Sequence, residues 1–513
     1  MVRRSLITLV ILLGLAGSAD AANKCVNPAA SGDDTTSYAA NNGTTVCWDT
    51  LGRAVWGNAS RSAPDATEAA KAGDTVLVTG GTYHSDATTG VNSTPLYNPA
   101  GTGTAGNYIT FTCVGTCTIE APVARGPAIG ADGKDYIKWY ADVTLGYSWT
   151  MVSDAAGGNT ADTSANSTWV NVKPDTGPVV LNNTTGSWLE GLILDGGAQQ
   201  EQEDNYPGIE LENCTSCVVR NNVIFGFQCA SGNHNGAGIM LYSAADPIIE
   251  HNLFYGSGVS IYIKGETTFA QTGVIFRYNL ITSCLAANSG CIFVYISNAA
   301  RIYQNIISGG PACIEFGGLD AVNASDADWA FNNTCISPSV AGILYNGSTT
   351  PPWFSGGRAW NTIVYNAPTV ILWADSTFQV DTYLDYEHNL YNTFTTFAND
   401  STATSYAAFS SWTGAFASQD QASPVSITSA PGFANAAGSD YRLCTGAGTP
   451  HASCAGASAG LNLGVDLGDL DGDASTTDNI NAGAHVTNLE TIGVETAQAG
   501  GSTTYHLRRP GAQ

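Results

Sequence analysis

The stretch Asn222-Val-Ile and six later stretches of the same design decide the fold of this chain. Each places an asparagine before a short, mostly apolar run, and the intervals between these anchors are 30, 27, 26, 28, 28 and 28 residues. The anchors are Asn222, Asn252, Asn279, Asn305, Asn333, Asn361 and Asn389. A repeat of this length with one short strand after each anchor indicates stacked coils, because a single unit does not bury its own apolar face. We therefore predict a parallel β-solenoid with an internal asparagine ladder, since Asn suits left-handed corners and hydrogen-bonds to the same residue one coil away.

A second repeat lies before each anchor and consists of a small residue followed by a strand with alternating aliphatic positions. Its six copies begin at Gly208, Gly238, Gly258, Cys291, Cys313 and Gly342. Such alternation is typical of a strand with one buried and one solvent-facing side. The distance from this strand to its anchor is 14 residues in three coils and 19 to 21 in three others. The same connection therefore takes repeated insertions, and we expect loops to project from one working side of the stack.

The first 21 residues have the features of a secretory signal peptide, with an Arg pair, an apolar stretch and an Ala-x-Ala ending at Ala21. Removing them takes away Arg3, Arg4 and Asp20 and leaves 16 basic and 42 acidic side chains, a net charge of −26. This acidity argues against nucleic acid as a partner. The mature part has no long apolar stretch, so we expect no membrane span. The predicted location is secreted, either extracellular or periplasmic.

All 13 cysteines lie after the signal peptide, and export makes disulfides the first interpretation. The expected close pairs are Cys25 with Cys47, Cys113 with Cys117, Cys214 with Cys217, and Cys444 with Cys454. Cys291 and Cys313 hold equivalent positions in successive coils, where a stacking distance of about 4.8 Å is within disulfide reach of about 4.4 to 6.8 Å. Metal binding by Cys214-x-x-Cys217 is the alternative, although no second pair with zinc spacing follows. The odd count leaves at least one cysteine outside a disulfide.

Beyond the signal peptide of residues 1–21 we predict three regions. Residues 22–105 form an N-terminal cap region with the first strands, residues 106–400 form parallel β-helix repeats, and residues 401–513 form a C-terminal closing segment with an acidic turn. The run from Asp65 predicts a short amphipathic helix that ends at Gly73. Such a helix would cover the open end of the solenoid, which otherwise exposes a sheet edge.

Three features together carry a resemblance to a known family. They are Gly73-Asp-Thr-Val-Leu-Val with the later Gly80-Gly-Thr-Tyr, the Asn-anchored coils, and the ending around Gly464-Val-Asp-Leu-Gly-Asp. In these features the chain resembles the secreted bacterial right-handed parallel β-helix proteins of the pectate-lyase-like superfamily, over nearly the whole mature part. The resemblance implies an all-β fold, a right-handed parallel β-helix (β-solenoid) with an N-terminal helical cap and an irregular C-terminal cap. It does not select a function, because this fold hosts lyases, hydrolases, epimerases, adhesins and tail fibres.

Family patterns of catalytic residues match only in part. The Asn-Thr-Asp, Asp-Asp and His-Gly series typical of polygalacturonases is absent, and so is the Arg-x-Pro-x-x-Arg of classical pectate lyases. Alginate and chondroitin lyases of this fold use a Lys on one coil and an Arg on a neighbouring one. Lys264 fits the first role, but Phe293 and Tyr295 stand where the arginine is expected.

The outward positions of the repeated strand carry an aromatic cluster. We predict that Tyr242, Tyr262 and Tyr295 form one exposed column, with Phe293 in it and His234 in a loop beside it. Flat rings with polar tips and nearby charge suit a sugar chain lying across a sheet. Tyr242, Tyr295, Phe293 and His234 are therefore candidates for substrate binding. The alternative is that the rings only support neighbouring coils by cross-strand pairing, and that His234 is an ordinary exposed loop residue.

Candidate catalytic groups lie on the same strands. Lys264 is the only lysine after Gly208, and with Tyr262 it would supply the base and the acid that lyase chemistry on an acidic sugar requires. Glu210 and Glu212 lie about 6 to 7 Å apart at the backbone, which suits a glycosidase pair or a Ca²⁺ site. The alternatives are a solvated lysine and two solubilising glutamates.

A candidate metal site lies near the C-terminus. Asp469, Asp471 and Asp473 alternate around Gly472 and resemble the start of a Ca²⁺ loop, although the glycine comes one place early and no Glu occupies the twelfth position. The alternative is an acidic turn of the cap. Together these features predict a polysaccharide-active protein with Ca²⁺ as its cofactor, most simply a lyase for an acidic glycan, with a glycoside hydrolase second. A non-catalytic surface, adhesion or carbohydrate-binding β-helix protein is the alternative from another class.

Overall fold

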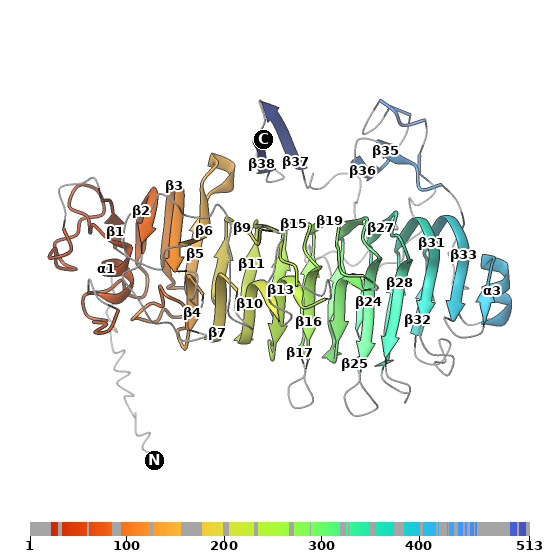
Figure 1. Cartoon of the computed structure of the whole chain (residues 1–513), viewed down its shortest axis with the longest axis horizontal. Coiled ribbons are helices and arrows are strands. Elements are labelled where there is room, and N and C mark those ends of the chain that lie inside the picture. Colours follow the sequence, from red (N-terminus) through yellow and green to blue (C-terminus); the bar gives the residue numbers. More distant parts are fainter. Residues whose placement is uncertain are drawn as a thin grey trace, which may run out of the picture.

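The computed structural model describes a large part of the chain. The described residues are 22–28, 33–58, 61–84, 94–122, 127–154, 177–197, 205–229, 234–265, 271–287, 289–318, 325–326, 328–347, 354–373, 384–400, 404–416, 419, 428, 430–435, 440–444, 447–448, 452–455, 457–458, 493–499 and 502–508. The predicted signal peptide and the three aspartates at 469, 471 and 473 lie outside them. In the described part, parallel strands stack in one direction and form an elongated β-solenoid (Figure 1).

From β7 (Val179–Thr185) onward, a typical coil contributes one strand to each of three faces. The first face, which carries the strand after the small residue, contains β4 (Ile129–Asp132), β7 (Val179–Thr185), β10 (Tyr206–Thr215), β13 (Gly236–Tyr242), β16 (Val259–Lys264), β20 (Gly290–Tyr295), β24 (Ala312–Gly318) and β28 (Ala341–Gly347). Every neighbouring pair in this series is parallel. The first face is therefore one continuous parallel sheet that runs along the solenoid.

The second face begins at the N-terminus of the described chain. It contains β1 (Asn23–Val26), β2 (Thr75–His84), β3 (Ile109–Pro122), β5 (Ile137–Ala141), β8 (Trp188–Glu190), β11 (Val218–Arg220), β14 (Ile248–Glu250), β18 (Ile275–Arg277), β22 (Arg301–Tyr303), β26 (Trp329–Phe331), β30 (Gly357–Trp360) and β32 (Leu384–Glu387). Short strands β17 (Gln271–Thr272), β21 (Ser297–Asn298), β25 (Ser325–Asp326) and β29 (Phe354–Ser355) stack in the corner that leads to it from the first face.

The third face follows the asparagine anchors. It contains β6 (Ser148–Asp154), β9 (Leu192–Asp195), β12 (Val223–Phe225), β15 (Leu253–Tyr255), β19 (Leu280–Thr282), β23 (Ile306–Ser308), β27 (Thr334–Ile336), β31 (Ile363–Trp373) and β33 (Leu390–Asp400). The long strand β31 pairs with β27 at its start and with β28 at its end, so it bends from the third face into the first. The aliphatic side chains of all three faces meet inside the solenoid, where Ile209, Val219 and Ile224 are fully buried.

The asparagine ladder is present between the second and third faces. The Nδ2 of Asn222 donates to the Oδ1 of Asn252 at 2.9 Å, and the same bond continues to Asn279 (3.0 Å), Asn305 (3.1 Å) and Asn333 (3.1 Å). Each Oδ1 along this run also accepts the backbone N–H of the preceding anchor. These fully buried amides satisfy one another, which is the condition for burying a polar column in an apolar interior.

One anchor is not part of the ladder. Ile363 pairs with Thr334 and Leu390, so the ladder position of this coil is Thr362, and the prediction for Asn361 was wrong by one residue. Thr362 donates its backbone N–H to the Oδ1 of Asn389 at 2.8 Å. Asn361 occupies the left-handed corner instead, with φ of 53°. In the other coils this corner belongs to the residue before the anchor, for example Asn221, His251 and Tyr278.

A short helix closes the N-terminal end, but at another place than predicted. Asp65 does not begin a helix, because its carboxylate accepts hydrogen bonds from the backbone and hydroxyl of Thr67 and holds a turn. The helix is α1 (Leu51–Trp56). Its N-cap residue is Thr50, whose side chain accepts a hydrogen bond from the backbone N–H of Arg53, and its C-cap residue is Gly57 in the left-handed conformation. All six residues of α1 are buried.

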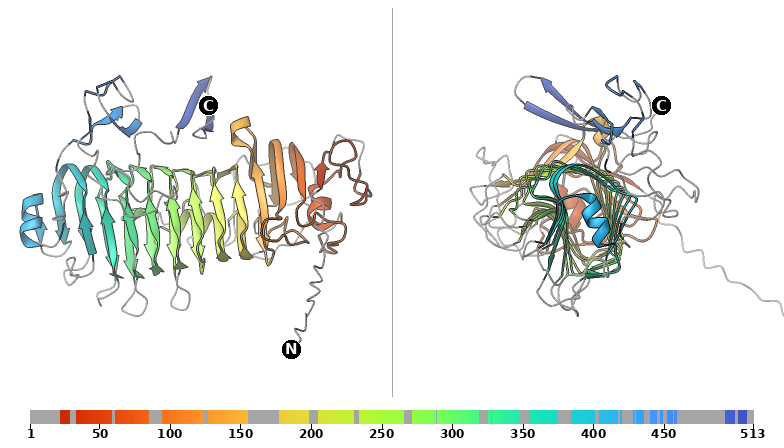
Figure 2. Two further views of the ribbon diagram at one scale, coloured as in Figure 1. Left: turned by 180° about the vertical axis from the view of Figure 1, so that it is seen from behind. Right: turned by 90° about the vertical axis from the view of Figure 1, so that its right-hand side faces the viewer.

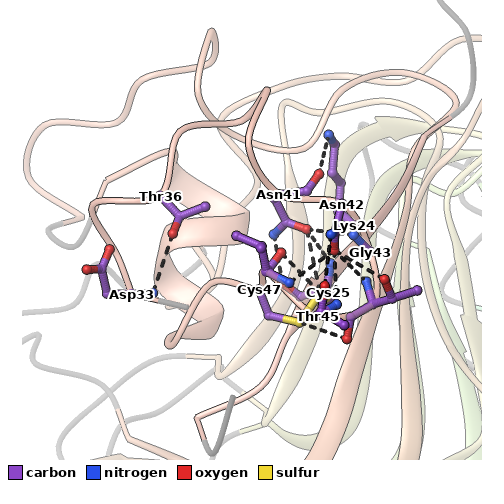
Figure 3. The surroundings of a disulfide bond; sticks show 11 residues. Lys24, Cys25, Asp33, Thr36, Asn41, Asn42, Gly43, Thr45 and Cys47 are labelled. Atoms are coloured by element: carbon purple, nitrogen blue, oxygen red, sulfur yellow. Dashed lines mark hydrogen bonds between the residues drawn. A yellow bond between two sulfur atoms is a disulfide. The ribbon is translucent and has the colours of Figure 1, made fainter. Parts of the chain in front are cut away.

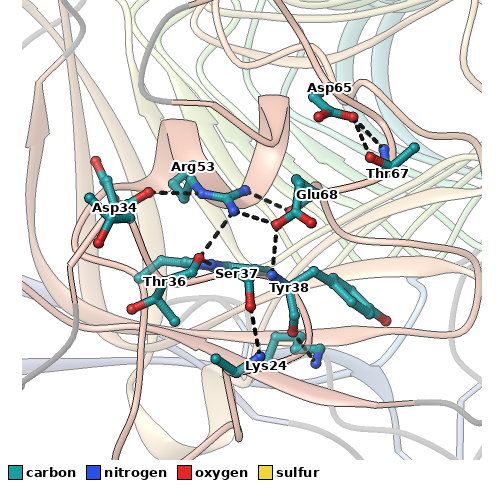
Figure 4. Close-up of polar contacts among 12 residues, drawn as sticks. Lys24, Asp34, Thr36, Ser37, Tyr38, Arg53, Asp65, Thr67 and Glu68 are labelled. Carbon is teal, nitrogen blue, oxygen red and sulfur yellow. Dashed lines mark hydrogen bonds and ion pairs between the residues drawn. The ribbon is translucent and has the colours of Figure 1, made fainter.

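Polar contacts fix this N-terminal cap to the first strand. Arg53 donates to the Glu68 carboxylate and to the carbonyl of Thr36 (Figure 4). The disulfide between Cys25 and Cys47 ties β1 to the loop before α1, and the amide of Asn41 pairs with both backbone groups of Cys25 (Figure 3). The predicted cap of the solenoid therefore exists, built by residues upstream of the predicted ones.

The opposite end is covered by α3 (Phe409–Ala415). Trp412 of this helix is fully buried and its ring lies 6.1 Å from the rings of Trp373 and Tyr386. The end-on view in Figure 2 shows α3 seated across the last coil. β34 (Ser405–Tyr406) pairs with β33, and the hairpins β35 (Phe433–Asn435) with β36 (Asp440–Leu443) and β37 (Gly493–Ala499) with β38 (Ser502–Arg508) follow.

Six disulfides account for twelve of the cysteines. The four predicted close pairs are all formed. Cys291 and Cys313 are not bonded to each other. Cys291 pairs with Cys284 and Cys313 with Cys335, because each finds a partner on the neighbouring strand or turn of its own coil. The zinc alternative for Cys214 and Cys217 is thereby excluded, and the buried Cys229 is the cysteine outside these disulfides.

Candidate functional site

The strand register on the first face differs from the predicted one at β16. Ile261 pairs with Ile239 on one side and Ile292 on the other, so Ser260, not Gly258, is equivalent to Gly238 and Cys291. The prediction was wrong by two residues here. A slip of two preserves the alternation of buried and outward positions, so the sequence pattern cannot detect it.

The corrected register divides the outward residues into two rows. The inner row consists of Glu210, Met240, Tyr262, Phe293, Glu315 and Leu344. The outer row consists of Glu212, Tyr242, Lys264, Tyr295, Gly317 and Asn346. The three tyrosines therefore do not form one column, because Tyr262 belongs to the inner row and Tyr242 and Tyr295 to the outer row.

The side chains of the inner row are mostly buried, although they point away from the interior of the solenoid. Met240 is fully buried, and Tyr262 and Phe293 are each 4% exposed, in an apolar cluster separate from the interior. The rings of Tyr262 and Phe293 stack at 4.7 Å, and the imidazole of His234 lies edge-on to both at 5.1 Å. The prediction of an exposed column was therefore wrong for Tyr262 and Phe293. Tyr242 and Tyr295 of the outer row are half-buried.

Lys264 is the centre of the outer row. Its Nζ donates to the Oδ1 of Asn205 at 2.9 Å and lies 3.4 Å from the hydroxyl of Tyr242. The same ammonium lies 5.4 Å from the ring centre of Tyr242 and 5.5 Å from that of Tyr262, which favours a cation between them. The tyrosine hydroxyl within reach of Lys264 is thus Tyr242, and not Tyr262 as the sequence suggested.

Two titratable groups of this cluster have shifted pKa values. Burial, with the nearby Lys264 charge as a second cause, lowers the pKa of His234, so its neutral imidazole is favoured. Burial raises the pKa of Tyr262 far above its ordinary range, and the charges of Tyr295 and Glu315 act in the same direction. Tyr262 is consequently a poor proton donor to a base or substrate at neutral pH.

Glu315 is a site residue that the sequence did not single out. It is 1% exposed, and its carboxylate accepts hydrogen bonds from Ser289 Oγ and Gly290 N–H, both at 2.7 Å, and from Asn346 Nδ2 at 3.1 Å. Burial raises the pKa of Glu315, while these hydrogen bonds oppose the shift. The available signal was a carboxylate at an outward position of a strand that is otherwise apolar.

Glu210 and Glu212 lie at the start of the two rows. Glu210 is buried beside Met240, and Glu212 is half-buried beside Tyr242. Glu210 lies two coils from Tyr262, and Glu212 lies two coils from Lys264, which is about 9 to 10 Å along the stack. The structure thus brings Tyr242, Lys264, Tyr295 and His234 together and places the two glutamates one coil further away.

These residues do not fit a Ca²⁺ site. Ca²⁺ takes six to eight oxygen ligands, whereas an ammonium lies at the centre of this cluster and the Glu315 oxygens accept hydrogen bonds from three donors. Within the described ranges no group of three His, Cys, Asp or Glu residues is placed to hold a metal ion. The candidate loop of Asp469, Asp471 and Asp473 lies outside those ranges.

Comparison with known proteins gives one local family match. Residues 144–318 match the family described as periplasmic copper-binding protein (NosD). No curated protein sequence matches the chain. The matched segment runs from the early coils to the end of β24, so it includes Tyr242, Lys264 and Glu315. The family description is consistent with a periplasmic or extracellular location.

Several solved structures are similar to this one. Pectate lyase Pel9A is 14% identical with a TM-score of 0.44, over 91% of this chain and 98% of that chain. An alginate lyase from Paenibacillus sp. strain FPU-7 is 14% identical with a TM-score of 0.32, over 64% and 88%. The surface protein and adhesin PfbA of Streptococcus pneumoniae is 7% identical with a TM-score of 0.30, over 65% and 88%.

None of the helices in the described ranges has the length and apolar character needed to cross a membrane.

Proposed function

We propose that this chain is an exported polysaccharide-active protein whose site is the outer row of the first face, centred on Lys264. The observation that carries the proposal is the contact of 3.4 Å between Lys264 Nζ and Tyr242 Oη. A second tyrosine, Tyr295, lies on the other side of the lysine in the same row. An amine and a phenol within reach of each other, between half-buried rings, supply a proton acceptor, a proton donor and surfaces for a sugar.

The reaction that suits this pair is lyase-type cleavage of an acidic glycan. The amine of Lys264, in its unprotonated form, removes the proton from the carbon that bears the carboxyl group. The electron pair of that C–H bond forms a C=C bond, and the bond from the neighbouring carbon to the linking oxygen breaks. Tyr242 donates its proton to that oxygen. The products are a new reducing end and an unsaturated uronate. Lys264 has then gained one proton and Tyr242 has lost one, and proton exchange with solvent restores both groups.

Asn205 and His234 position this pair. The 2.9 Å bond from Lys264 to Asn205 fixes the ammonium beside the tyrosine. The half-buried neutral His234 covers Tyr262 and Phe293 and is available to hydrogen-bond a sugar hydroxyl. No step of this reaction passes through Ca²⁺. Calcium binding by Asp469, Asp471 and Asp473 stays a separate proposal, and calorimetric titration of the mature protein against an Asp471→Asn variant tests it.

A second candidate is a non-catalytic carbohydrate-binding or adhesion protein. The burial of Tyr262, Phe293 and Glu210 favours it, because these groups cannot contact a substrate without movement of the residues that cover them. In that case Lys264 and the two outer tyrosines bind a glycan without cleaving it. A glycoside hydrolase is less well supported, since Glu210 is buried while its partner Glu212 is half-buried.

A polysaccharide panel distinguishes these functions. Purified mature protein is incubated with alginate, polygalacturonate, chondroitin sulfate and neutral dextran, with Ca²⁺ added in one series. Ultraviolet absorbance of the unsaturated product reports a lyase, reducing ends without absorbance report a hydrolase, and affinity electrophoresis reports binding alone. Lys264→Ala removes the proposed base, and Lys134→Ala is the matched control, because the Lys134 ammonium donates to the Ala100 carbonyl and lies in an early coil, away from the proposed site.

A further inference from the structure

The outer row of the first face changes its chemistry from coil to coil. Along the solenoid it consists of Glu212, Tyr242, Lys264, Tyr295 and Gly317, so one cation lies between two aromatic rings and a carboxylate lies two coils before it. Successive coils are about 4.8 Å apart, which is close to the length that one pyranose adds to a polysaccharide chain. A glycan that runs along this row therefore places about one sugar on each coil.

Lys264 is the only Lys or Arg in the first-face strands β7 to β28 and in the connections on either side of them. Within residues 174–400 the other Lys and Arg side chains belong to second-face strands, and they are Arg220, Arg277, Arg301 and Arg358. Burial lowers the pKa of His234, which lies beside this row, and favours its neutral form. This part of the first face therefore carries its positive charge on one coil, and an anionic ligand finds a matching charge there alone.

The charges around Lys264 are otherwise negative. Glu212 lies two coils away in the same row and is half-buried. In the sequence, the connections next to the first-face strands contain further acidic residues, which are Glu201, Glu203, Asp204, Glu266 and Asp320. Like charges repel at short range, and the repulsion grows where protein replaces water. A glycan with a carboxylate on every sugar would match one of them at Lys264 and set another against Glu212.

The two tyrosines of the outer row provide contacts for sugars that carry no charge. Tyr242 and Tyr295 lie one coil before and one coil after Lys264, and both rings are half-buried. The ring of Tyr295 lies against Gly317, where a Cβ atom would come within 3.1 Å of the Cδ2 atom of Tyr295. Gly317 thus leaves room for this ring in the row. An aromatic face suits the C–H face of a neutral pyranose, and it offers a carboxylate no matching charge.

We propose that this site takes a polysaccharide whose single uronates are separated by at least two neutral sugars. The inference rests on the function proposed for Lys264 and names its class of substrate. The uronate lies at Lys264, with neutral sugars on Tyr242 and Tyr295 and a further neutral sugar at Glu212. The protonated amine attracts the carboxylate of the incoming uronate, and the unprotonated amine then removes the proton beside it. Polymers with closely spaced uronates fit less well, because a second carboxylate reaches Glu212.

The test compares uronate polymers that differ in the spacing of their carboxylates, with EDTA present so that no divalent cation bridges like charges. Polygalacturonate and alginate carry a carboxylate on every sugar, unsulfated chondroitin carries one on every second sugar, and deacylated gellan has three neutral sugars between successive uronates. Product absorbance measures cleavage, and affinity electrophoresis measures binding. We expect the mature protein to bind and cleave gellan at least roughly tenfold better than polygalacturonate and alginate, with chondroitin between them.

A variant separates the effect of carboxylate spacing from that of sugar identity. Glu212→Gln removes the charge two coils from Lys264, and we expect it to improve binding of polygalacturonate, alginate and chondroitin by roughly threefold or more, because each places a carboxylate there. Binding of gellan should stay within about twofold of the parent. Asp33→Asn, in an exposed turn of the N-terminal cap, makes the same change in net charge and should bind all these polymers like the parent. Thermal melting checks the fold of both variants, and the order found for the parent tests the inference if Glu212→Gln does not fold.

The outcomes separate this inference from the function on which it rests. Unsaturated product formed faster from polygalacturonate or alginate than from gellan would support the lyase and overturn the inference. If no polymer yields product but gellan binds best, the lyase fails and the class of glycan stands for a binding protein. Equal binding of all these polymers by the parent, binding of none of them, or an equal gain for gellan in Glu212→Gln would show that the inference is wrong.

Discussion

The hydroxyl of Tyr242 and the ammonium of Lys264 lie 3.4 Å apart on adjacent coils of the first face. The two residues are 22 positions apart in the sequence, and only the stacking of β13 on β16 brings them together. A two-residue shift of β16 would keep Lys264 on the outside but move it away from Tyr242 by about 6 to 7 Å along the strand. The register of β16 therefore decides which tyrosine hydroxyl lies within reach of Lys264.

The first prediction compares the two tyrosines near Lys264. Tyr242→Phe should lower cleavage of the best substrate by roughly two to four orders of magnitude, as expected for loss of a general acid. Tyr262→Phe should change it by less than about tenfold, because the Tyr262 hydroxyl is buried and its pKa is strongly raised. Initial rates from product absorbance measure both. The opposite ranking would return the acid role to Tyr262.

The second prediction concerns the asparagine ladder. Asn279 is fully buried and bonds Asn252 and Asn305 as well as the carbonyls of Ile249 and Arg277. Asn279→Ala leaves several buried groups without partners and should lower the free energy of unfolding by roughly 3 to 5 kcal/mol. The control is Asn366→Gly, at an exposed corner with φ of 54°, where glycine fits and the effect should stay within about 1 kcal/mol. Urea denaturation measures both, and equal effects would contradict the ladder.

The third prediction concerns pH. The pKa of His234 is lowered in the folded state, so between that value and the ordinary value of about 6.5 the unfolded chain binds more protons. Its contribution to stability is therefore complete above the ordinary value and is lost as the pH falls through the folded value. His234→Gln should flatten the rise of stability with pH in this window. Denaturation at a series of pH values measures the slope, and an unchanged slope would exclude His234 as its source.

Much of the fold could be predicted from periodic residues, because each ladder position has a strict physical requirement. A buried amide that pairs with the equivalent amide of the next coil requires asparagine at regular intervals in the sequence. The prediction of the ladder failed only at Asn361, because an Asn also suits the left-handed corner next to Thr362. The N-terminal helix was misplaced because a carboxylate such as that of Asp65 supports a turn as readily as a helix start.

For the site, the sequence predicted which residues point outward from the strand, but not how they are arranged relative to one another. Alternation reports which side of a strand is outward, so Tyr242, Lys264 and Tyr295 were correctly assigned to the outside. It does not report register in steps of two, and it does not report what covers an outward residue. His234 is brought against Tyr262 and Phe293 by a connection between coils, and no period in the sequence encodes that contact. Glu315 lies next to Phe293 through the register of β24, but the sequence pattern does not report that it is buried.

If Lys264 and Tyr242 cleave an acidic glycan by elimination, unsaturated product forms only while the amine of Lys264 is present. The ultraviolet absorbance of unsaturated product is followed for wild type, Lys264→Ala and Lys134→Ala on each uronate-containing polysaccharide of the panel. We predict product with wild type and Lys134→Ala on at least one polysaccharide, and a loss of at least about a hundredfold with Lys264→Ala, whose thermal melting stays like wild type. Wild-type activity in Lys264→Ala, or no unsaturated product from wild type on any of them, would contradict the claim.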